Sequence, residues 1–167
     1  MALIRMDIQS VVVGAGPVAS VVVLKPRHDS GPSSKLPIRI GSIEAVSISM
    51  GIDGREHKRP MTHDLLGSVI STLDASVASV IISDVQGTTF FAQLRLVSSL
   101  GEPLCVDARP SDALALAVRV HAPIFAESSV LDTAALPDFA SVERDERQKE
   151  AEAFHDFVEG LSPEDFA

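Results

Sequence analysis

The stretch Asp107-Ala108-Arg109-Pro110-Ser111-Asp112-Ala113 decides how this chain folds. It follows an apolar run over 104–106 that is typical of a strand, and it precedes an apolar segment, 114–120, with helical spacing. Pro110 disfavours helical backbone at the residue before it, and Ser111 can then cap a helix by accepting a backbone N–H. The stretch therefore predicts a corner at which a strand ends and a helix begins.

The polar side chains at this corner exceed what a helix start requires. One hydroxyl is enough for a cap, yet Asp107, Arg109 and Asp112 also lie at the positive end of the predicted helix. Two interpretations remain open at this point. Arg109 can pair with Asp107 simply to fix the corner, or the charged group can belong to a functional site.

Outward from this corner, the hydrophobic pattern predicts strands over residues 3–13, 18–25, 36–40, 79–82, 89–94, 104–107 and 123–126. Helices are predicted over 43–50, over 63–73 with Thr62 as the N-cap, and from residue 111 onward. A charged, helix-prone segment covers 141–160. Its late apolar patch cannot be buried by one helix alone, so we expect it to dock on the body or on a partner subunit.

The order of these elements indicates an internal duplication. Residues 36–40 align with 104–108, and the same alignment places Glu44-Ala45 on Asp112-Ala113 before an apolar helix in both copies. We therefore predict an α+β fold in which a β-β-β-α unit occurs twice, over 3–50 and 76–121, forming a mixed or antiparallel sheet with flanking helices. Chance similarity between two amphipathic units is the alternative. A true repeat would place Glu44 and Asp112 around one pseudo-symmetric cleft.

Length and charge divide the chain into a body and a tail. The 167 residues fit one domain, which we place at 1–135, followed by an acidic helical tail at 136–167. Residues 1–126 hold eleven Lys/Arg and eleven Asp/Glu, whereas 127–167 hold three and twelve. The net charge of −9 thus belongs to the tail, and the charge of the body does not decide for or against nucleic acid.

The remaining composition predicts a cytoplasmic protein with no membrane partner. No apolar run approaches the roughly 20 residues of a membrane span, and the N-terminus lacks a signal-peptide pattern. The single cysteine, Cys105, excludes an intramolecular disulfide and a cysteine-cluster zinc site. We expect Cys105 to be a buried, small apolar residue of its strand.

Four ordered segments of the chain resemble one known family. They are Leu36-Pro37-Ile38-Arg39-Ile40-Gly41 with Glu44-Ala45, Arg59-Pro60-Met61-Thr62-His63-Asp64-Leu65-Leu66, Thr89-Phe90-Phe91-Ala92, and Asp107 through Ala113. Ala122-Pro123-Ile124-Phe125 and Ser162-Pro163-Glu164-Asp165-Phe166 agree as well. These motifs are similar to the bifunctional nuclease domain family, formerly catalogued as a domain of unknown function.

The resemblance implies DNase and RNase activity, which is attributed to some plant members of the family. It also implies an α+β fold with a duplicated β-rich unit, and a homo-oligomer. The chain departs from the family pattern at two positions: Arg39 replaces an aromatic residue, and Phe91 replaces the tyrosine of many members. Any chemistry that uses that tyrosine hydroxyl elsewhere must be performed differently here.

Phosphodiester hydrolysis requires cationic groups for the phosphoryl oxygens and an activated water molecule. The phosphate-binding candidates are Arg59, Arg109 and Ser111, the two arginines each lying just before a proline and a helix start. The catalytic candidates are His63, Asp107, Asp112 and Glu44. His63 can act as the general base or can join these carboxylates or Asp64 as a ligand of a divalent metal. Asp64 and Asp107 are the candidate ligands of a divalent metal, Mg²⁺ or Mn²⁺.

Each candidate also has a structural alternative. Arg59 can brace two corners by pairing with Asp64 or Asp107, and acids near a helix start favour the dipole without further function. The function that the family resemblance implies is metal-assisted hydrolysis of DNA or RNA. The alternative is a non-catalytic oligomeric binding or regulatory protein whose charged cluster binds an anion such as a small phosphorylated ligand.

Overall fold

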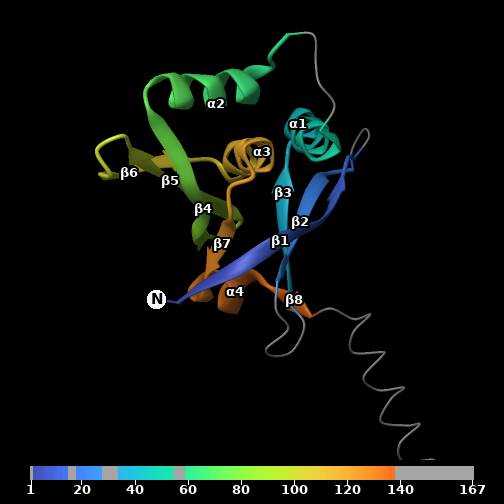
Figure 1. Cartoon of the computed structure of the whole chain (residues 1–167). Coiled ribbons are helices and arrows are strands. Elements are labelled where there is room, and N and C mark those ends of the chain that lie inside the picture. The colour runs from blue at the N-terminus through green and yellow to red at the C-terminus, as the bar shows by residue number, and fades with distance from the viewer. Residues whose placement is uncertain (1, 15–17, 28–33, 55–58, 138–167) are drawn as a thin grey trace, which may run out of the picture.

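The computed structural model describes residues 2–14, 18–27, 34–54 and 59–137. Two antiparallel three-stranded meanders form most of its sheet (Figure 1). The first contains β1 (Leu3–Val12), β2 (Ser20–Pro26) and β3 (Ser34–Ile40), and the second contains β4 (Ala75–Gln86), β5 (Thr89–Ser98) and β6 (Pro103–Ala108).

A short strand, β7 (Ile124–Glu127), joins the two meanders because it lies antiparallel to β1 and parallel to β4. The strand order is β6-β5-β4-β7-β1-β2-β3-β8, in which the two-residue β8 (Leu136–Pro137) pairs only with the start of β3. The sheet is therefore mixed, and the predicted α+β class is confirmed.

A helix follows each meander, α1 (Ser42–Asp53) after β3 and α3 (Pro110–Val120) after β6. Each meander is thus followed by a helix, and the internal duplication of a β-β-β-α unit stays a prediction. Helix α2 (Thr62–Thr72) lies between α1 and β4 in the chain, and α4 (Ser128–Ala134) precedes β8. Figure 1 shows α3 in the middle of the molecule with α1 and α2 beside it, and α4 at the other end of the sheet.

Helix α3 is the centre of the hydrophobic core. Its residues 113–117, Ala-Leu-Ala-Leu-Ala, are all buried, as expected of a helix with neighbours on every side. The sheet contributes alternate residues, such as Val22 and Leu24 on β2 and Val80 and Ile82 on β4. Because α3 is enclosed in this way, the side chains at its two ends are held in fixed positions.

The helix starts differ from the sequence-based expectation by one or two residues. Pro110 occupies the first turn of α3, so Arg109 is the N-cap and Ser111 lies inside the helix, 6% exposed, rather than capping it. Met61, not Thr62, is the N-cap of α2, and its N–H donates to Asp64 Oδ2 at 2.8 Å. Helix α3 therefore begins at Pro110 and α2 at Thr62, and each start is closer to the N-terminus than predicted.

Other boundaries were underestimated. Strand β4 has 12 residues, eight more than its apolar run predicts, because β5 pairs with it along its length. Helix α4 was not predicted.

Cys105 is exposed, contrary to expectation, because β6 lies at the edge of the sheet and, within the described residues, pairs with β5 alone. Residues 136 and 137 form β8 rather than a helix, and the rest of the predicted acidic helix, 138–167, lies outside the described residues.

Within the described residues, no helix combines the length and apolar character needed to cross a membrane.

Two helical glycines provide a test of how closely α3 packs against its neighbours. A Cβ on Gly51 of α1 would lie 2.5 Å from Val118 Cγ2 and 2.8 Å from Arg119 Nη1, whereas one on Gly67 of α2 would meet Val120 Cγ1 at 3.4 Å. We expect Gly51→Ala to lower the free energy of unfolding by about 1–3 kcal/mol through overpacking. Gly67→Ala should raise it by up to about 1 kcal/mol through helix propensity.

Urea unfolding of the two variants beside the wild type measures both effects. Gly67→Ala is the matched control because it makes the same change on a neighbouring helix. Equal effects of the same sign in both variants would contradict the close contact between α1 and α3.

Candidate functional site

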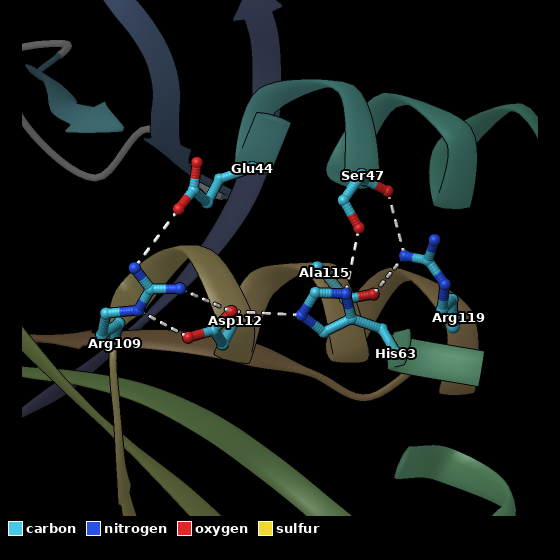
Figure 2. Close-up of polar contacts among 7 residues, drawn as sticks. All are labelled: Glu44, Ser47, His63, Arg109, Asp112, Ala115 and Arg119. Carbon is cyan, nitrogen blue, oxygen red and sulfur yellow. Dashed lines mark hydrogen bonds and ion pairs between the residues drawn. The ribbon is translucent and has the colours of Figure 1, made fainter. Parts of the chain in front are cut away.

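Helices α1, α2 and α3 meet in a cluster of charged and polar side chains, which we call the inter-helix network (Figure 2). Its members come from segments far apart in the sequence, and the dashed lines of Figure 2 mark most of the contacts between them. They are Glu44 and Ser47 from α1, His63 and Asp64 from α2, and Arg109, Asp112 and Arg119 from the N-cap and body of α3.

Arg109 forms the outer end of the network. Its Nε and Nη2 donate to the two carboxylate oxygens of Asp112 at 2.8 and 3.2 Å, and its Nη1 donates to Glu44 Oε1 at 3.2 Å. The side chain is nevertheless 67% exposed. The hydrogen bond and charge of Asp112 raise the pKa of Arg109, so the group is a permanent cation open to solvent.

Asp112 links Arg109 to His63. Partial burial by itself raises the pKa of Asp112, but hydrogen bonds from Arg109 and His63 outweigh burial and lower the pKa overall. The carboxylate is thus ionised at neutral pH and can only accept hydrogen bonds. One of its oxygens, Oδ1, lies 3.2 Å from His63 Nε2.

This contact assigns the tautomer of His63. Because the Asp112 carboxylate accepts, Nε2 of the neutral ring carries the hydrogen, and Nδ1 presents its lone pair. That lone pair faces Ser47 Oγ at 3.0 Å, so the Ser47 hydroxyl donates to the ring. The side chain of His63 is 14% exposed, which keeps most water away from these bonds.

Arg119 forms the inner end of the network and joins all three helices. Its Nε donates to Asp64 Oδ1 at 2.6 Å on α2, and its Nη1 donates to the backbone oxygens of Ser47 on α1 and Ala115 on α3 at 3.0 and 2.8 Å. The side chain is only 9% exposed. A buried guanidinium needs several acceptors, and this arrangement supplies them.

Two pockets meet at Arg109 and Glu44, which contribute to the lining of both. The first pocket, of about 380 Å³, lies between the end of β3, the turn from β4 to β5 and the start of α3; Thr88, Thr89, Phe90 and Ser111 also line it. The second, of about 300 Å³, lies between α1 and α2 and contains Ser47, His63 and Asp112 among apolar side chains. We call them the polar pocket and the apolar pocket.

The structure brings four predicted site residues into direct contact: Glu44, His63, Arg109 and Asp112. Ser111 lines the polar pocket, and Asp64 belongs to the inner end of the network. Two others stand apart. Asp107 is exposed on β6 opposite Gln93, and Arg59 is exposed ahead of α2; in the described part of the chain neither side chain joins an ion pair.

These positions show which of the predicted charges pair. Arg109 pairs with Asp112 and Glu44 instead of Asp107, and Asp64 pairs with Arg119. Sequence reasoning missed Ser47 and Arg119. Arg119 carried a signal, because it is a single charge in the otherwise apolar segment 114–120. Ser47 carried none, since nothing in the sequence distinguishes it from Ser42 or Ser49.

The residues present do not form the predicted divalent-metal site. Within the described ranges, no three His, Cys, Asp or Glu side chains converge on one point. Asp107 lies apart from Asp64, whose Oδ1 is held by Arg119, and both oxygens of Asp112 are held by Arg109. Binding of Mg²⁺ or Mn²⁺ here thus requires these ion pairs to break, and the metal remains a prediction from the sequence.

Removal of the Arg119 guanidinium tests the inner end of the network. Arg119→Met keeps an unbranched side chain but removes the guanidinium that donates to Asp64 Oδ1 and to two backbone carbonyls. We expect the free energy of unfolding to fall by about 2–3 kcal/mol. Arg95→Met, on the exposed side of β5, is the matched control and should change it by less than about 0.5 kcal/mol. Similar urea midpoints for the two variants would show that Arg119 does not brace the helices.

The lowered pKa of Asp112 predicts a dependence of stability on pH. Because the pKa is lower in the folded state, ionised Asp112 stabilises the fold above its unfolded pKa of about 4. This contribution is lost as the pH falls through the folded pKa. The difference in unfolding free energy between wild type and Asp112→Asn should therefore shrink as the pH falls below about 4.

Thermal unfolding between pH 7 and pH 2 measures this difference. Asp107→Asn serves as the control because the Asp107 carboxylate makes no ion pair among the described residues. A difference between wild type and Asp112→Asn that stays constant over this range would mean that Asp112 does not stabilise the fold through its charge.

Comparison with known proteins agrees with the likeness seen in the motifs. Residues 22–138, which include the whole inter-helix network, match the family described as "Bifunctional nuclease domain". Uncharacterized proteins from two Mycobacterium tuberculosis strains, CDC 1551 and H37Rv, are each 42% identical to this chain over 135 residues, covering 78% of this chain and 80% of theirs. The chain belongs to the bifunctional nuclease domain family.

Proposed function

We propose that this protein is a nuclease that cleaves phosphodiester bonds at the junction of the polar and apolar pockets. The observation that carries the proposal is the position of Arg109, a solvent-exposed cation that lines both pockets and connects through Asp112 to His63. The family description supports it. In this proposal Arg109 binds the phosphate, and His63 accepts a proton from the water that attacks phosphorus. The P–O bond to the departing oxygen breaks, and that oxygen takes the proton from His63.

Arg109 retains the capacity to bind an anion while it is paired. A guanidinium has five N–H groups, and the contacts with Asp112 and Glu44 use three of them. The remaining two can donate to a phosphate as a fork. Thr88, Thr89 and Ser111 line the polar pocket beside it. In the first turn of α3 the N–H of Ser111 is the remaining donor, because Pro110 has no N–H and the Asp112 N–H bonds to Arg109 O at 3.1 Å.

His63 is arranged as a general base. Asp112 holds the Nε2 hydrogen and stabilises the ring when it becomes positively charged. Nδ1 is the basic atom, and a water molecule displaces the Ser47 hydroxyl from it before the ring takes a proton from that water. The pair of Arg109 and His63 therefore supplies both charge stabilisation and proton transfer from protein side chains. No step in this scheme uses a metal ion.

The charges of the site favour short or single-stranded substrates. The network holds three carboxylates and two guanidinium groups, so it does not attract a long polyanion in the way that a basic surface does. Phe90 in the polar pocket offers an aromatic face for one unstacked base. We propose single-stranded RNA or DNA as the substrate.

The second candidate is a non-catalytic protein that binds a small phosphorylated ligand through Arg109. One specific observation favours it: Glu44, Asp64 and Asp112 are all closed in ion pairs, which suits a site that holds an anion without reacting. The two candidates differ in what the loss of His63 does. Loss of His63 abolishes cleavage if the protein is a nuclease, whereas ligand binding by Arg109 persists if the protein is a non-catalytic binding protein.

The test uses end-labelled single-stranded RNA and DNA with highly purified protein, once in EDTA and once in Mn²⁺. We expect cleavage in EDTA, a loss of about 100-fold or more in His63→Gln, and a similar loss in Arg109→Met. Arg95→Met is the matched control, an exposed arginine remote from the network, and should cleave like the wild type.

Other outcomes contradict the proposal in distinguishable ways. Equal cleavage by every variant would identify a contaminating nuclease or another site. Cleavage that occurs only in Mn²⁺ would show that the mechanism requires a divalent metal. No cleavage by wild type, together with inorganic phosphate binding that Arg109→Met abolishes, would establish the second candidate.

A further inference from the structure

The apolar pocket contains a serine, a histidine and an aspartate bonded in series. Ser47 Oγ lies 3.0 Å from His63 Nδ1, and His63 Nε2 lies 3.2 Å from Asp112 Oδ1. We propose that Ser47 is an activated nucleophile, and that the protein hydrolyses carboxylic esters with a short apolar acyl group through an acyl-Ser47 intermediate. This activity shares His63 and Asp112 with the proposed nuclease but does not depend on phosphodiester cleavage.

The direction of the Ser47 hydroxyl is the first observation. Three other helical hydroxyls, on Ser68, Thr72 and Thr133, donate to the backbone oxygen four residues earlier, which is their usual partner in a helix. Ser47 does not follow this pattern; its hydroxyl contacts the imidazole of His63 across the gap between α1 and α2 (Figure 2).

The order of the three groups is the second observation. The ionised Asp112 fixes the hydrogen on Nε2, so Nδ1 is free to take the Ser47 proton, and the resulting imidazolium is stabilised by the same carboxylate. The ring is turned relative to the usual serine hydrolase, in which Nε2 faces the serine. Either ring nitrogen can act as the base, because a neutral imidazole has one donor and one acceptor.

The pocket itself is the third observation. Its volume of about 300 Å³ lies at the small end of ligand pockets, and Ile43, Val46, Met50 and Met61 give it an apolar lining. Ile43 is 81% exposed and Val46 44%, so the protein leaves this apolar surface open beside the serine. A short alkyl or acyl chain suits such a lining better than a nucleotide does.

In this proposal the first turn of α2, whose residues also line the pocket, supplies the donors for the developing oxyanion. Thr62 and His63 are in the first turn of α2, and their backbone N–H groups have no partner within the helix. Such donors stabilise the negative oxygen of a tetrahedral intermediate. The pocket thus combines a nucleophile, a base, an orienting carboxylate and oxyanion donors.

The reaction follows from these roles. Ser47 Oγ bonds to the acyl carbon as its proton moves to His63 Nδ1, and the ester C–O bond breaks as the departing alcohol takes that proton. Water then attacks the acyl carbon and gives a proton to Nδ1. The acid leaves, and Ser47 Oγ recovers the proton. The steps consume one ester and one water and release one alcohol and one acid.

Covalent labelling tests the proposal without nucleic acid. An alkyl fluorophosphonate is incubated with the full-length protein, and the intact mass and labelled peptide are determined. We expect one adduct per chain on Ser47, absent in Ser47→Ala and His63→Gln. Ser49→Ala, two residues along the same helix, is the control and should label like the wild type. Hydrolysis of p-nitrophenyl butyrate should fall at least about 100-fold in Ser47→Ala.

Several results would overturn the proposal. One is that the wild type forms no adduct under conditions in which a known serine hydrolase is labelled. The others are an adduct on a residue other than Ser47, and equal ester hydrolysis by wild type and Ser47→Ala. Peptide mapping on the wild type keeps the test valid even if a variant fails to fold. Ester hydrolysis without nucleic-acid cleavage would support Ser47 as the nucleophile and contradict the proposed nuclease. Nucleic-acid cleavage without ester hydrolysis would support the nuclease and contradict the role of Ser47.

Discussion

The burial of the middle of α3, residues 113–117, is the constraint on which the rest of the structure depends. A helix whose residues 113–117 are all enclosed can be accommodated only if the sheet packs against it and α1 and α2 lie beside it. Its alanines permit close approach, and the absence of a side chain at Gly51 brings α1 near Val118 and Arg119. The side chains at the ends of α3 then point into the gaps between helices, and the inter-helix network occupies those gaps.

The inter-helix network combines a buried end that stabilises the fold with an exposed end that can bind a ligand. At its inner end, Arg119 is almost fully buried, and its hydrogen bonds to Asp64 and to two carbonyls offset the loss of hydration. At its outer end, Arg109 is mostly exposed, and its ion pairs are weaker because water screens them. The inner end therefore serves stability, whereas the outer end has donors left over for a ligand. His63 and Asp112 lie between the two and line the apolar pocket.

The sequence predicted most of the secondary structure and part of the site. Apolar periodicity located every strand of the two meanders, and Pro110 located the start of α3 to within one residue. The predictions were weakest where strand pairing decides how long a strand is or which of its residues are exposed. Strand β4 extends beyond its apolar run because β5 lies beside it. Cys105 is exposed because, among the described strands, β6 pairs with β5 alone. In the site, Glu44, His63, Arg109 and Asp112 were identified from residue type and family likeness. Ser47 was not, because its significance depends entirely on the direction of one hydroxyl.

By itself, the sequence determined the α+β class, the two meanders with their following helices, and the residue types that can carry charge and protons. These features are local, since they depend on hydrophobic period, on proline and on turn chemistry over a few neighbouring residues. Only the tertiary structure decided which charges pair, that Asp107 stands apart, and that a serine of α1 faces a histidine of α2. Apart from the Arg109–Asp112 pair, whose residues are three positions apart, these contacts join residues separated by 16 to 65 positions, and helix packing sets their distances. No local pattern in the chain records them.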